Sequence, residues 1–453
     1  MLKISQNRLL FWGQVSIFIG QNFGDFKEHN MKIDLKYGDS HLDLNLPDRN
    51  LLKVLELEKV PGVPDVTKAC ANALLNPIGS RKLSEIARGK KTALIVVSDF
   101  TRGVPYKREN FNLLLPIIEE LHKAGIKDED VKFLVGTGAH RPHTDKENRD
   151  NFGDEIVDNY EVISHECDKD CISLGMLSTG NELLINKLVP ESDVVVMTGL
   201  ITTHYFGGYS GGRKGILPGV VARETIRRNH AMVLRPGVGL ARTKGSPISD
   251  EMSEAAQKAG VDFLLNVVIN DKKEIVKIAA GDLEKAFEQG VEACDELYRV
   301  VVDEPADAVF ACAGGYPKDV NLYQTMKTMN NARQVAKPGG TIVLITEAKE
   351  GIGSDTFDRW LLEADSLDQL LSTPEKDIVV GGHTAVINSR ILKEFEVLVV
   401  SSMNKDTLEQ RFFGHADSLD HAIEKIKAKH GDDFKSYVMP QGGLIYPCLK
   451  KCS

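Results

Sequence analysis

The sequence predicts an α/β protein with two α/β domains, each built on a mostly parallel sheet, and with its active site in the cleft between them. Three observations support this fold class. The chain has 453 residues, which is too long for one hydrophobic core. Short, continuous apolar runs, typical of strands buried on both faces, recur along it. Segments with apolar residues at helical spacing separate these runs, as they do in βαβ units.

The first half of the chain is predicted to begin with a hairpin and to continue as alternating helices and strands. Residues 31–46 alternate between polar and apolar side chains, which is typical of a β-hairpin. Residues 64–87 and 111–125 place their apolar side chains at helical spacing. Buried strands are predicted at 92–99, 131–138, 160–166 and 193–199.

A second α/β unit is predicted to begin near Tyr298. A helix-compatible segment occupies 322–336. The strand-like runs of this unit are two within 299–315 and one each at 338–347, 377–383 and 395–402. We therefore divide the chain into a first domain at 31–297, a second domain at 298–436, and a tail at 437–453 that is expected to pack back on the first domain.

Residues 1–30 are expected to form a non-structural extension. Their apolar run is interrupted by Gln14 and Ser16 and is too short to span a bilayer. No small-residue cleavage site of a signal peptide follows it. Met31 begins a strand-like segment, so folding is expected to start there, which would suit a start codon assigned too early. A weak membrane anchor is the alternative for this extension.

The amino-acid composition indicates which kinds of partner the protein can bind and in which cellular compartment it works. The formal net charge of -9 argues against general binding to nucleic acid, which needs a basic face. The seven cysteines are scattered and odd in number, a pattern typical of reduced thiols in the cytoplasm. We therefore expect a cytoplasmic protein with no nucleic-acid or membrane partner.

Three of the predicted strands end in polar clusters directly before a helix. The clusters are SDFTR at 98–102, GTGAHRPHT at 136–144 and TGLITTHYFGG at 198–208. Ligands bind at the carboxyl ends of the strands in open α/β sheets. The side chains at these three ends are therefore expected to converge on one site. They are Asp99, Arg102, His140 and His204.

Residues 200–230 form a glycine-rich loop that contains three candidate chemical groups. His204 precedes Lys214 by ten residues, and His230 follows Lys214 after sixteen. Glycines allow the backbone to pass close to a bound group. The spacing excludes a P-loop, because Arg213 stands where the Walker A lysine is required and Gly215 stands where a magnesium-binding hydroxyl would follow Lys214.

The histidines leave more than one chemistry open, because imidazole titrates near neutral pH and suits both acid–base catalysis and metal binding. One alternative is a zinc-dependent hydrolase in which His140, His204 and His230 bind the metal and leave an open water site. Their separation by a loop and a helix is unlike a short zinc-binding spacing. Another alternative is a non-catalytic protein that carries a cofactor or binds a small anion.

The motifs together resemble those of a known family, the nickel-pincer-dependent lactate racemases, which are racemases and epimerases of 2-hydroxy acids. The resemblance covers nearly everything from Met31 onward. The motifs that show it are SDFTR at 98–102, GTGAHRP at 136–142, HYFGGYSGGRK at 204–214, His230, and YQTMK at 323–327.

The resemblance implies a cofactor and the residues that hold it. The family's cofactor is nickel with pyridinium-3,5-bisthiocarboxylic acid mononucleotide, the nickel-pincer nucleotide, which is linked covalently to a lysine. Two sulfurs, a ring carbon and one histidine bind the nickel. Carried over to this sequence, Lys214 resembles the attachment point and His230 resembles the nickel ligand. Residues 31–297 are then implied to be the cofactor-binding domain.

The resemblance also implies roles for the other motif residues. His140 and His204 resemble the paired catalytic bases. Asp99 and Arg102 resemble residues that contact the cofactor. The residues that resemble the substrate contacts are Arg102, Tyr323, Gln324 and Lys327.

The activity that the resemblance implies is racemisation of a 2-hydroxy acid by proton-coupled hydride transfer. Direct loss of the Cα proton is disfavoured by the adjacent carboxylate, whereas loss of the hydroxyl proton together with a hydride gives a planar 2-keto acid. Two bases are needed because the two enantiomers present their hydroxyls differently. The implied partners are the small-molecule substrate and the enzymes that make and install the cofactor.

One region departs from the family pattern. The family has an aromatic wall residue in the region around 381–390, whereas the segment here, GGHTAVINSR, contains no tryptophan. This difference favours a substrate that is larger or more polar than lactate. His383 is a candidate contact to such a substrate, although a plain helix N-terminal position is the more common role for a histidine placed there.

Overall fold

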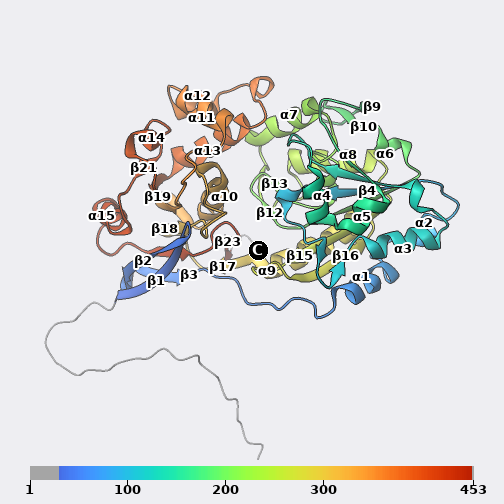
Figure 1. The fold of residues 1–453 in the computed structure, drawn as a ribbon. Coiled ribbons are helices and arrows are strands. Elements are labelled where there is room, and N and C mark those ends of the chain that lie inside the picture. The colour runs from blue at the N-terminus through green and yellow to red at the C-terminus, as the bar shows by residue number, and fades with distance from the viewer. Residues whose placement is uncertain (1–29, 451–453) are drawn as a thin grey trace, which may run out of the picture.

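The structure is a computed structural model that describes residues 30–450 of the chain. Two α/β units lie side by side in it, and each is organised around its own sheet (Figure 1), which confirms the predicted fold class. The extension predicted at residues 1–30 lies outside the described residues, apart from Asn30. Within 30–450, no helix is both long and apolar enough to cross a bilayer.

The first unit is built on a six-stranded sheet with the order β16-β15-β11-β4-β7-β8. All neighbouring strands are parallel except β16, which is antiparallel to β15. The strands are β4 (Ala93–Ser98), β7 (Val131–Gly136), β8 (Glu161–Ser164), β11 (Val194–Leu200), β15 (Phe263–Ile269) and β16 (Ile275–Gly281). Shorter strands outside this sheet are β5 (Lys107–Arg108), β6 (Phe111–Asn112), β9 (Cys171–Met176), β10 (Glu182–Asn186), β12 (Thr203–His204), β13 (Gly207–Tyr209) and β14 (Gly239–Leu240).

Helices cover both faces of the first sheet, which explains why its strands are continuous apolar runs. Along β4, Leu94 and Val96 point into one core, and Ile95 and Val97 point into the other. Helices α7, α8 and α9 pack on the first of these faces, and α1 to α5 pack on the second. The helices of this unit are α1 (Val66–Leu75), α2 (Leu83–Ile86), α3 (Leu115–Lys123), α4 (Asp145–Phe152), α5 (Asp154–Asn159), α6 (Leu188–Glu191), α7 (Arg223–Ala231), α8 (Pro247–Lys258) and α9 (Leu283–Tyr298).

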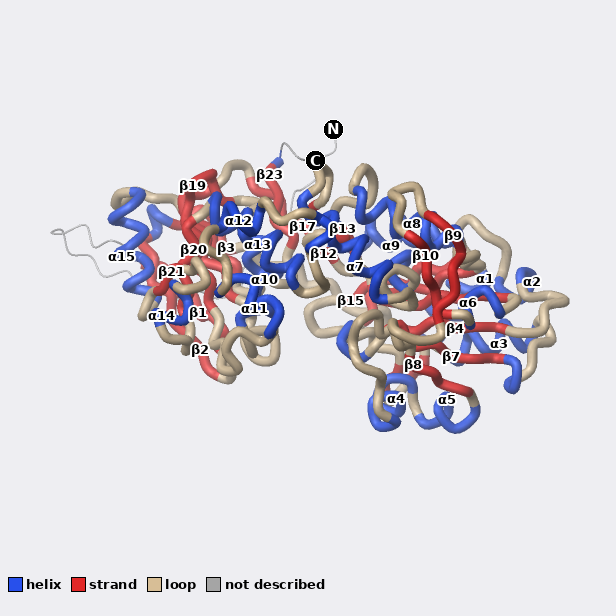
Figure 2. The backbone as a smooth tube through the Cα atoms, turned by 90° about the horizontal axis from the view of Figure 1, so that it is seen from above, coloured by secondary structure: helices blue, strands red, loops and turns tan. Residues whose placement is uncertain are grey.

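The second unit is built on a six-stranded, fully parallel sheet with the order β21-β20-β19-β18-β22-β3. Its strands are β3 (Leu51–Val54), β18 (Ala306–Cys312), β19 (Ala336–Ile345), β20 (Glu396–Val400), β21 (Gly414–His415) and β22 (Ser436–Met439). Its helices are α10 (Leu322–Ala332), α11 (Asp355–Leu362), α12 (Leu367–Leu371), α13 (Gly382–Glu394), α14 (Lys405–Glu409) and α15 (Leu419–His430). Figure 2 shows this unit and the first as separate groups of strands with helices around them.

The predicted hairpin forms, but it belongs to the second unit and not to the first. Strands β1 (Asn30–Tyr37) and β2 (Ser40–Pro47) pair over their whole length. Their apolar face, with Leu35 and Leu44, packs with Phe310 on the second sheet. Strand β3 then pairs with β22, which lies near the other end of the chain. In Figure 1 these first strands, in blue, lie beside the orange and red strands of the C-terminal part. The hairpin that we placed in the first domain therefore packs on the second sheet, because that sheet offers its apolar face a complementary surface.

The tail also differs from the expectation. Strand β22 is a member of the second sheet, and Ile445 packs in the core of that unit. Strand β23 (Tyr446–Leu449) pairs in parallel with β17 (Arg299–Val302). The described part of the tail, 437–450, therefore completes the second unit instead of packing on the first.

The structure also differs from the sequence-based expectations in three local elements. The apolar run at 377–383 is not a strand: it leads into α13, whose N-cap Gly381 has a φ of 91° that a strand does not use. The helix expected over 64–87 is divided into α1 and α2, because Pro77 follows Asn76 and cannot continue the α1 ladder. Strand β15, which pairs with β11, was not among the predicted strands.

Helix α13 joins the two units. Val386 and Ile387, on one side of this helix, belong to the core of the first unit, whereas Ile391 belongs to the core of the second. Two polar contacts accompany this packing: Arg390 donates to the carbonyl of Leu234, and Arg235 forms an ion pair with Glu375. The two units therefore meet through an interface that contains both apolar and polar contacts, with α13 at its centre.

Candidate active site

A cavity of about 480 Å³ opens at the carboxyl ends of β4, β7 and β11, and α10 of the second unit contributes to its wall. The predicted position at the strand ends is therefore where the structure has its cavity. Of the nine residues to which the family resemblance gave a role, all but Asp99 and His230 line it. The lining members are Arg102, His140, His204, Lys214, Tyr323, Gln324 and Lys327.

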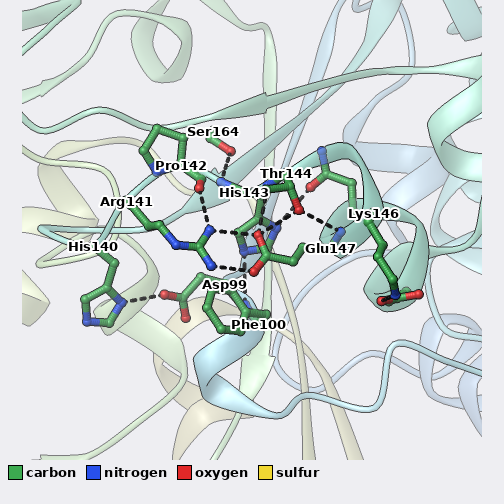
Figure 3. A network of polar contacts seen from close by, with 12 residues as sticks. Asp99, Phe100, His140, Arg141, Pro142, His143, Thr144, Lys146, Glu147 and Ser164 are labelled. Atoms are coloured by element: carbon green, nitrogen blue, oxygen red, sulfur yellow. Dashed lines mark hydrogen bonds and ion pairs between the residues drawn. The ribbon is translucent and has the colours of Figure 1, made fainter.

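Asp99 lies behind His140 and holds it. The carboxylate Oδ2 of Asp99 is 2.6 Å from Nδ1 of His140 (Figure 3). Its other oxygen accepts a hydrogen bond from Thr101 at 2.8 Å. Arg102 places Nε 3.6 Å from Oδ1 of Asp99. Burial of Asp99 by itself would raise its pKa, but the hydrogen bond from His140 and the charge of Arg102 outweigh burial and lower it. Asp99 is thus an ionised acceptor that orients His140.

The residues that follow His140 stabilise the loop instead of facing the cavity. The guanidinium of Arg141 forms a forked contact with Glu147, in the first turn of α4 (Figure 3). Nε2 of His143 accepts a hydrogen bond from the backbone N–H of Phe100, which ties this loop to the one that contains Asp99. Thr144 and Glu147 form a capping box at the start of α4. The second histidine of the motif is therefore structural.

The glycine loop brings His204 and Lys214 together at Gly207. A Cβ at Gly207 would lie 3.2 Å from Nζ of Lys214 and 3.4 Å from Nδ1 of His204, so this position has little space for a side chain. The backbone N–H of Gly207 donates to Nδ1 of His204 at 3.1 Å. A second glycine, Gly211, has a φ of 72°, and a Cβ there would be 2.7 Å from Oδ1 of Asn266. These two glycines permit the tight path of the loop.

Lys214 is a buried amine among cations. Burial lowers its pKa well below the usual value, and the charges of Arg102, Arg213 and Lys327 lower it further. Its Nζ lies 5.7 Å from the centre of the Phe206 ring. A lysine in these surroundings favours the neutral, nucleophilic form. Lys214 is therefore suited to covalent attachment of a ligand.

His204 and His230 are also buried in surroundings that disfavour a positive charge. Burial is the main cause that lowers the pKa of each well below its usual value. Lys214 adds to this effect at both histidines, and His383 adds to it at His230. His230 lies in the last turn of α7, and its Nδ1 is 3.2 Å from Oδ1 of Asn229, which fits a ring that donates through Nδ1 and keeps a lone pair on Nε2. A neutral imidazole with a free nitrogen can bind a metal.

Sequence reasoning gave no role to Phe206, although the structure places it at the centre of the site. Its ring is 3% exposed and has its centre 4.6 Å from that of His204, 5.0 Å from that of His230 and 5.3 Å from that of His383. The sequence feature that could have indicated Phe206 is its place in a pair of adjacent aromatic residues between His204 and the glycines. Phe206 is the common apolar wall between the proposed base, the proposed metal ligand and Lys214.

His383 occupies the helix N-terminal position that the sequence analysis named as its more common role. It lies in the first turn of α13, and its Nδ1 accepts from the backbone N–H of Gly381 at 3.1 Å. Its ring is also buried, with its centre 5.0 Å from that of His230. Burial, with a smaller effect of Lys214, lowers the pKa of His383 to about 4. It is a neutral neighbour of His230, and it is not among the residues that line the cavity.

The second unit supplies its residues from the start of α10. Asn321 caps this helix by accepting from the backbone N–H of Gln324 at 3.0 Å, which fixes the first turn. Tyr323 is 3.4 Å from Thr384 of α13 between their hydroxyl oxygens. Lys327 is buried one turn further on, and burial lowers its pKa. The cavity therefore has cations from both units and, among its lining residues, no carboxylate.

The zinc alternative is not supported by this arrangement. In the described part of the chain, no group of three or more histidine, cysteine, aspartate or glutamate side chains is placed to hold a metal ion. His140 faces Asp99, whereas His230 packs beyond Phe206 from His204.

Family models and curated proteins agree on what this chain is similar to. Residues 37–240 match the lactate racemase N-terminal domain, and residues 301–445 match the lactate racemase C-terminal domain. A lactate racemase from Lactiplantibacillus plantarum is 34% identical over 425 residues, which cover 91% of this chain and 99% of that protein. A lactate racemase from Thermoanaerobacterium thermosaccharolyticum is 35% identical over 425 residues, covering 90% and 97%.

Two solved structures are similar in fold. The lactate racemase apoprotein from Thermoanaerobacterium thermosaccharolyticum matches with a TM-score of 0.85 and 34% identity, covering 92% of this chain and 100% of that one. A protein from Thermotoga maritima matches with a TM-score of 0.60 and 20% identity, covering 86% and 100%. The second likeness concerns the fold alone.

Proposed function

Since this chain belongs to the lactate racemase family and is an isomerase, we propose that it interconverts the enantiomers of a 2-hydroxy acid, either lactate or a larger analogue. The observation that supports this proposal most is the composition of the cavity. Two proposed bases, a buried amine and cations from both units meet there, and no carboxylate lines it. Such a cavity attracts the carboxylate of a small acid and contains groups that can move its hydroxyl proton.

The residues fit the cofactor that the family resemblance implies. Lys214 is a buried amine with a lowered pKa, and His230 is a neutral imidazole with Nε2 available. Lys214 would hold the nickel-pincer nucleotide covalently, and His230 would bind its nickel, for which sulfur and imidazole donors are suitable. When bound, this cofactor supplies the hydride acceptor. A side chain at position 207 would meet Nζ of Lys214 at 3.2 Å, so a glycine there keeps the amine unobstructed.

Binding and orientation of the substrate would come from the polar lining of both units. Arg102 can hold a carboxylate by a forked contact, and Lys327 can add a point charge from the opposite unit. Tyr323 and Gln324 would donate further hydrogen bonds to the acid. Because these groups come from two units, the substrate would be held between them and shielded from water.

Proton transfer would belong to His140 and His204. His140 would take the hydroxyl proton at Nε2, and the Asp99 carboxylate at 2.6 Å would stabilise the imidazolium that results. His204 would do the equivalent for the other enantiomer, whose hydroxyl points to the other side. Asp99, which the resemblance implied to be a cofactor contact, is better described as the residue that positions His140.

The proposed setting is a cytoplasm that contains the enzymes for making and installing the cofactor. All six cysteines that the structure describes are free, and five of them are buried, with Cys70, Cys294 and Cys312 fully enclosed. Reduced thiols suit that compartment. Expression without the maturation enzymes would give a protein without the cofactor.

The test uses protein expressed together with cofactor-biosynthesis enzymes. Chiral chromatography would follow each enantiomer of lactate and of a panel of larger and more polar 2-hydroxy acids. Intact-mass measurement would show the covalent adduct, which Lys214→Ala is expected to lose. Protein with a confirmed adduct that converts no acid of the panel would refute the proposed activity. An unchanged adduct on Lys214→Ala would refute the attachment point.

A further inference from the structure

The two proposed bases use the same ring nitrogen to contact partners of opposite character. Nδ1 of His140 faces the Asp99 carboxylate, which can only accept a hydrogen bond while it is ionised. Nδ1 of His204 faces the backbone N–H of Gly207, which can only donate. The partner of a histidine's Nδ1 decides which nitrogen holds the proton of the neutral ring.

At His140 the proton is directed to Nδ1. The Asp99 side chain is only 1% exposed, and it also accepts from Thr101 and lies near Arg102, so it remains an ionised acceptor. The pKa of Asp99 is accordingly lowered, although burial opposes this. With Nδ1 protonated, Nε2 of the neutral His140 has a free lone pair and can act as a base.

At His204 the proton is directed to Nε2. A proton on Nδ1 would place two N–H donors against each other across 3.1 Å. The donor is firmly placed, because Gly207 pairs with Gly239 of β14 and the neighbouring Gly208 pairs with His204 itself. Burial, the largest cause, lowers the pKa of His204 and so also disfavours a second proton on this ring.

We propose that the two histidines rest in opposite tautomers. His140 is a base with a free Nε2, whereas His204 is a hydrogen-bond donor through Nε2–H. The Gly207 N–H is the group that positions His204. This inference rests on the proposed function, because its kinetic consequence concerns the proposed racemisation. In the resting protein, His140 is the one of the two that can take a hydroxyl proton: the O–H bond breaks, an N–H bond forms at Nε2, and the imidazolium lies beside Asp99. His204 can do the same only after its ring proton has moved to Nδ1 and the Gly207 bond has broken.

The proposal thus assigns an order to the two bases. The enantiomer whose hydroxyl faces His140 can react with the resting protein directly. The other enantiomer needs a prior rearrangement of His204. Since the two enantiomers have equal energy, kcat/KM is the same in both directions, so this asymmetry would appear in the separate kcat and KM values.

The test is a tautomer measurement on the full chain. Long-range 1H–15N correlation spectra of protein labelled with 15N-histidine distinguish a nitrogen that bears a proton from one with a lone pair. His140→Gln and His204→Gln assign the two sets of signals. We expect Nδ1–H in His140 and Nε2–H in His204 near pH 7. A proton on Nδ1 of His204, or the Nε2–H tautomer in His140, would overturn the proposal.

Asp99→Asn is the matched control, because it removes the negative charge and replaces one acceptor oxygen with an NH2 donor while it keeps the shape. We expect it to shift the tautomer of His140 and to leave the signals of His204 unchanged. A coupled change at His204 would show that these partners do not set the tautomers separately and would also overturn the proposal. The spectra need neither cofactor nor substrate, so their outcome is independent of whether the loaded enzyme racemises a given acid.

Discussion

Lys214 is expected to destabilise the folded protein before the cofactor is attached. Its amine is buried beside Arg102, Arg213 and Lys327, so the fold holds it at a cost. A polar group that folding removes from bulk water costs about 1–3 kcal/mol unless hydrogen bonds in the fold replace those to water. Lys214→Met keeps most of the side-chain volume and removes the amine, so we expect the free energy of unfolding to rise by about 1–3 kcal/mol near neutral pH.

The pH dependence of this gain has a definite sign. The pKa of Lys214 is lowered in the folded chain, first by burial and then by its cationic neighbours. An unfolded lysine has a pKa of about 10.4. Between these two pKa values the unfolded wild-type chain binds more protons, so wild-type stability rises with pH, by at most about 1.36 kcal/mol per pH unit. Methionine binds no proton, so the advantage of Lys214→Met should shrink as pH rises toward the pKa of the unfolded lysine.

Urea unfolding of protein expressed without the maturation enzymes would measure this difference. The change in midpoint, multiplied by the common slope, gives the change in the free energy of unfolding. Lys59→Met, at an exposed position, is the matched control and should change it by less than about 0.5 kcal/mol at any pH. A Lys214→Met variant that is less stable than wild type, or whose gain is the same at every pH, would refute the reasoning.

Further predictions concern the loaded enzyme. His140→Ala and His204→Ala should each lower kcat by about 10²–10⁴ while keeping the nickel content, and normal racemisation by both variants would contradict their assignment as bases. His230→Ala should lower the nickel content measured by mass spectrometry. His165→Ala, which removes another buried histidine of the same unit, should leave the nickel content unchanged. Equal nickel content in both variants would exclude His230 as the ligand. Arg102→Lys should raise KM for the 2-hydroxy acid about tenfold, because the forked contact is lost, and an unchanged KM would exclude that contact.

The strand ends could be predicted from the sequence because their signals are local. An apolar run followed by a polar cluster, as in the segment that ends at Asp99 and Arg102, shows both the strand and its carboxyl end. Parallel strands place these ends at one edge, so the meeting of His140 and His204 in one cavity followed from general topology. The glycines of the loop similarly indicated a close approach of the backbone, which Gly207 makes.

Features that depend on distant partners could not be predicted in this way. The hairpin at Asn30–Pro47 has the same alternation whichever sheet it covers, and nothing near it encodes the pairing of β3 with β22. The run at 377–383 is too short for periodicity to distinguish a strand from the approach to a helix. The contact between Gly207 and His204 depends on the turn between β12 and β13, which composition alone does not specify.

The pairing of β3 with β22 has a consequence for synthesis on the ribosome. Leu51 of β3 pairs with Ser436 of β22, so the whole first unit is inserted between two neighbouring strands of the second sheet. The ribosome adds about 5–20 residues per second, so β3 waits about 20–80 s for its partner after it is made. During that time the inserted unit can complete its own core. The nascent chain therefore presents a finished first unit while β3 is still unpaired and the hairpin of β1 and β2 has no sheet to cover, and these strands are where a chaperone would be needed.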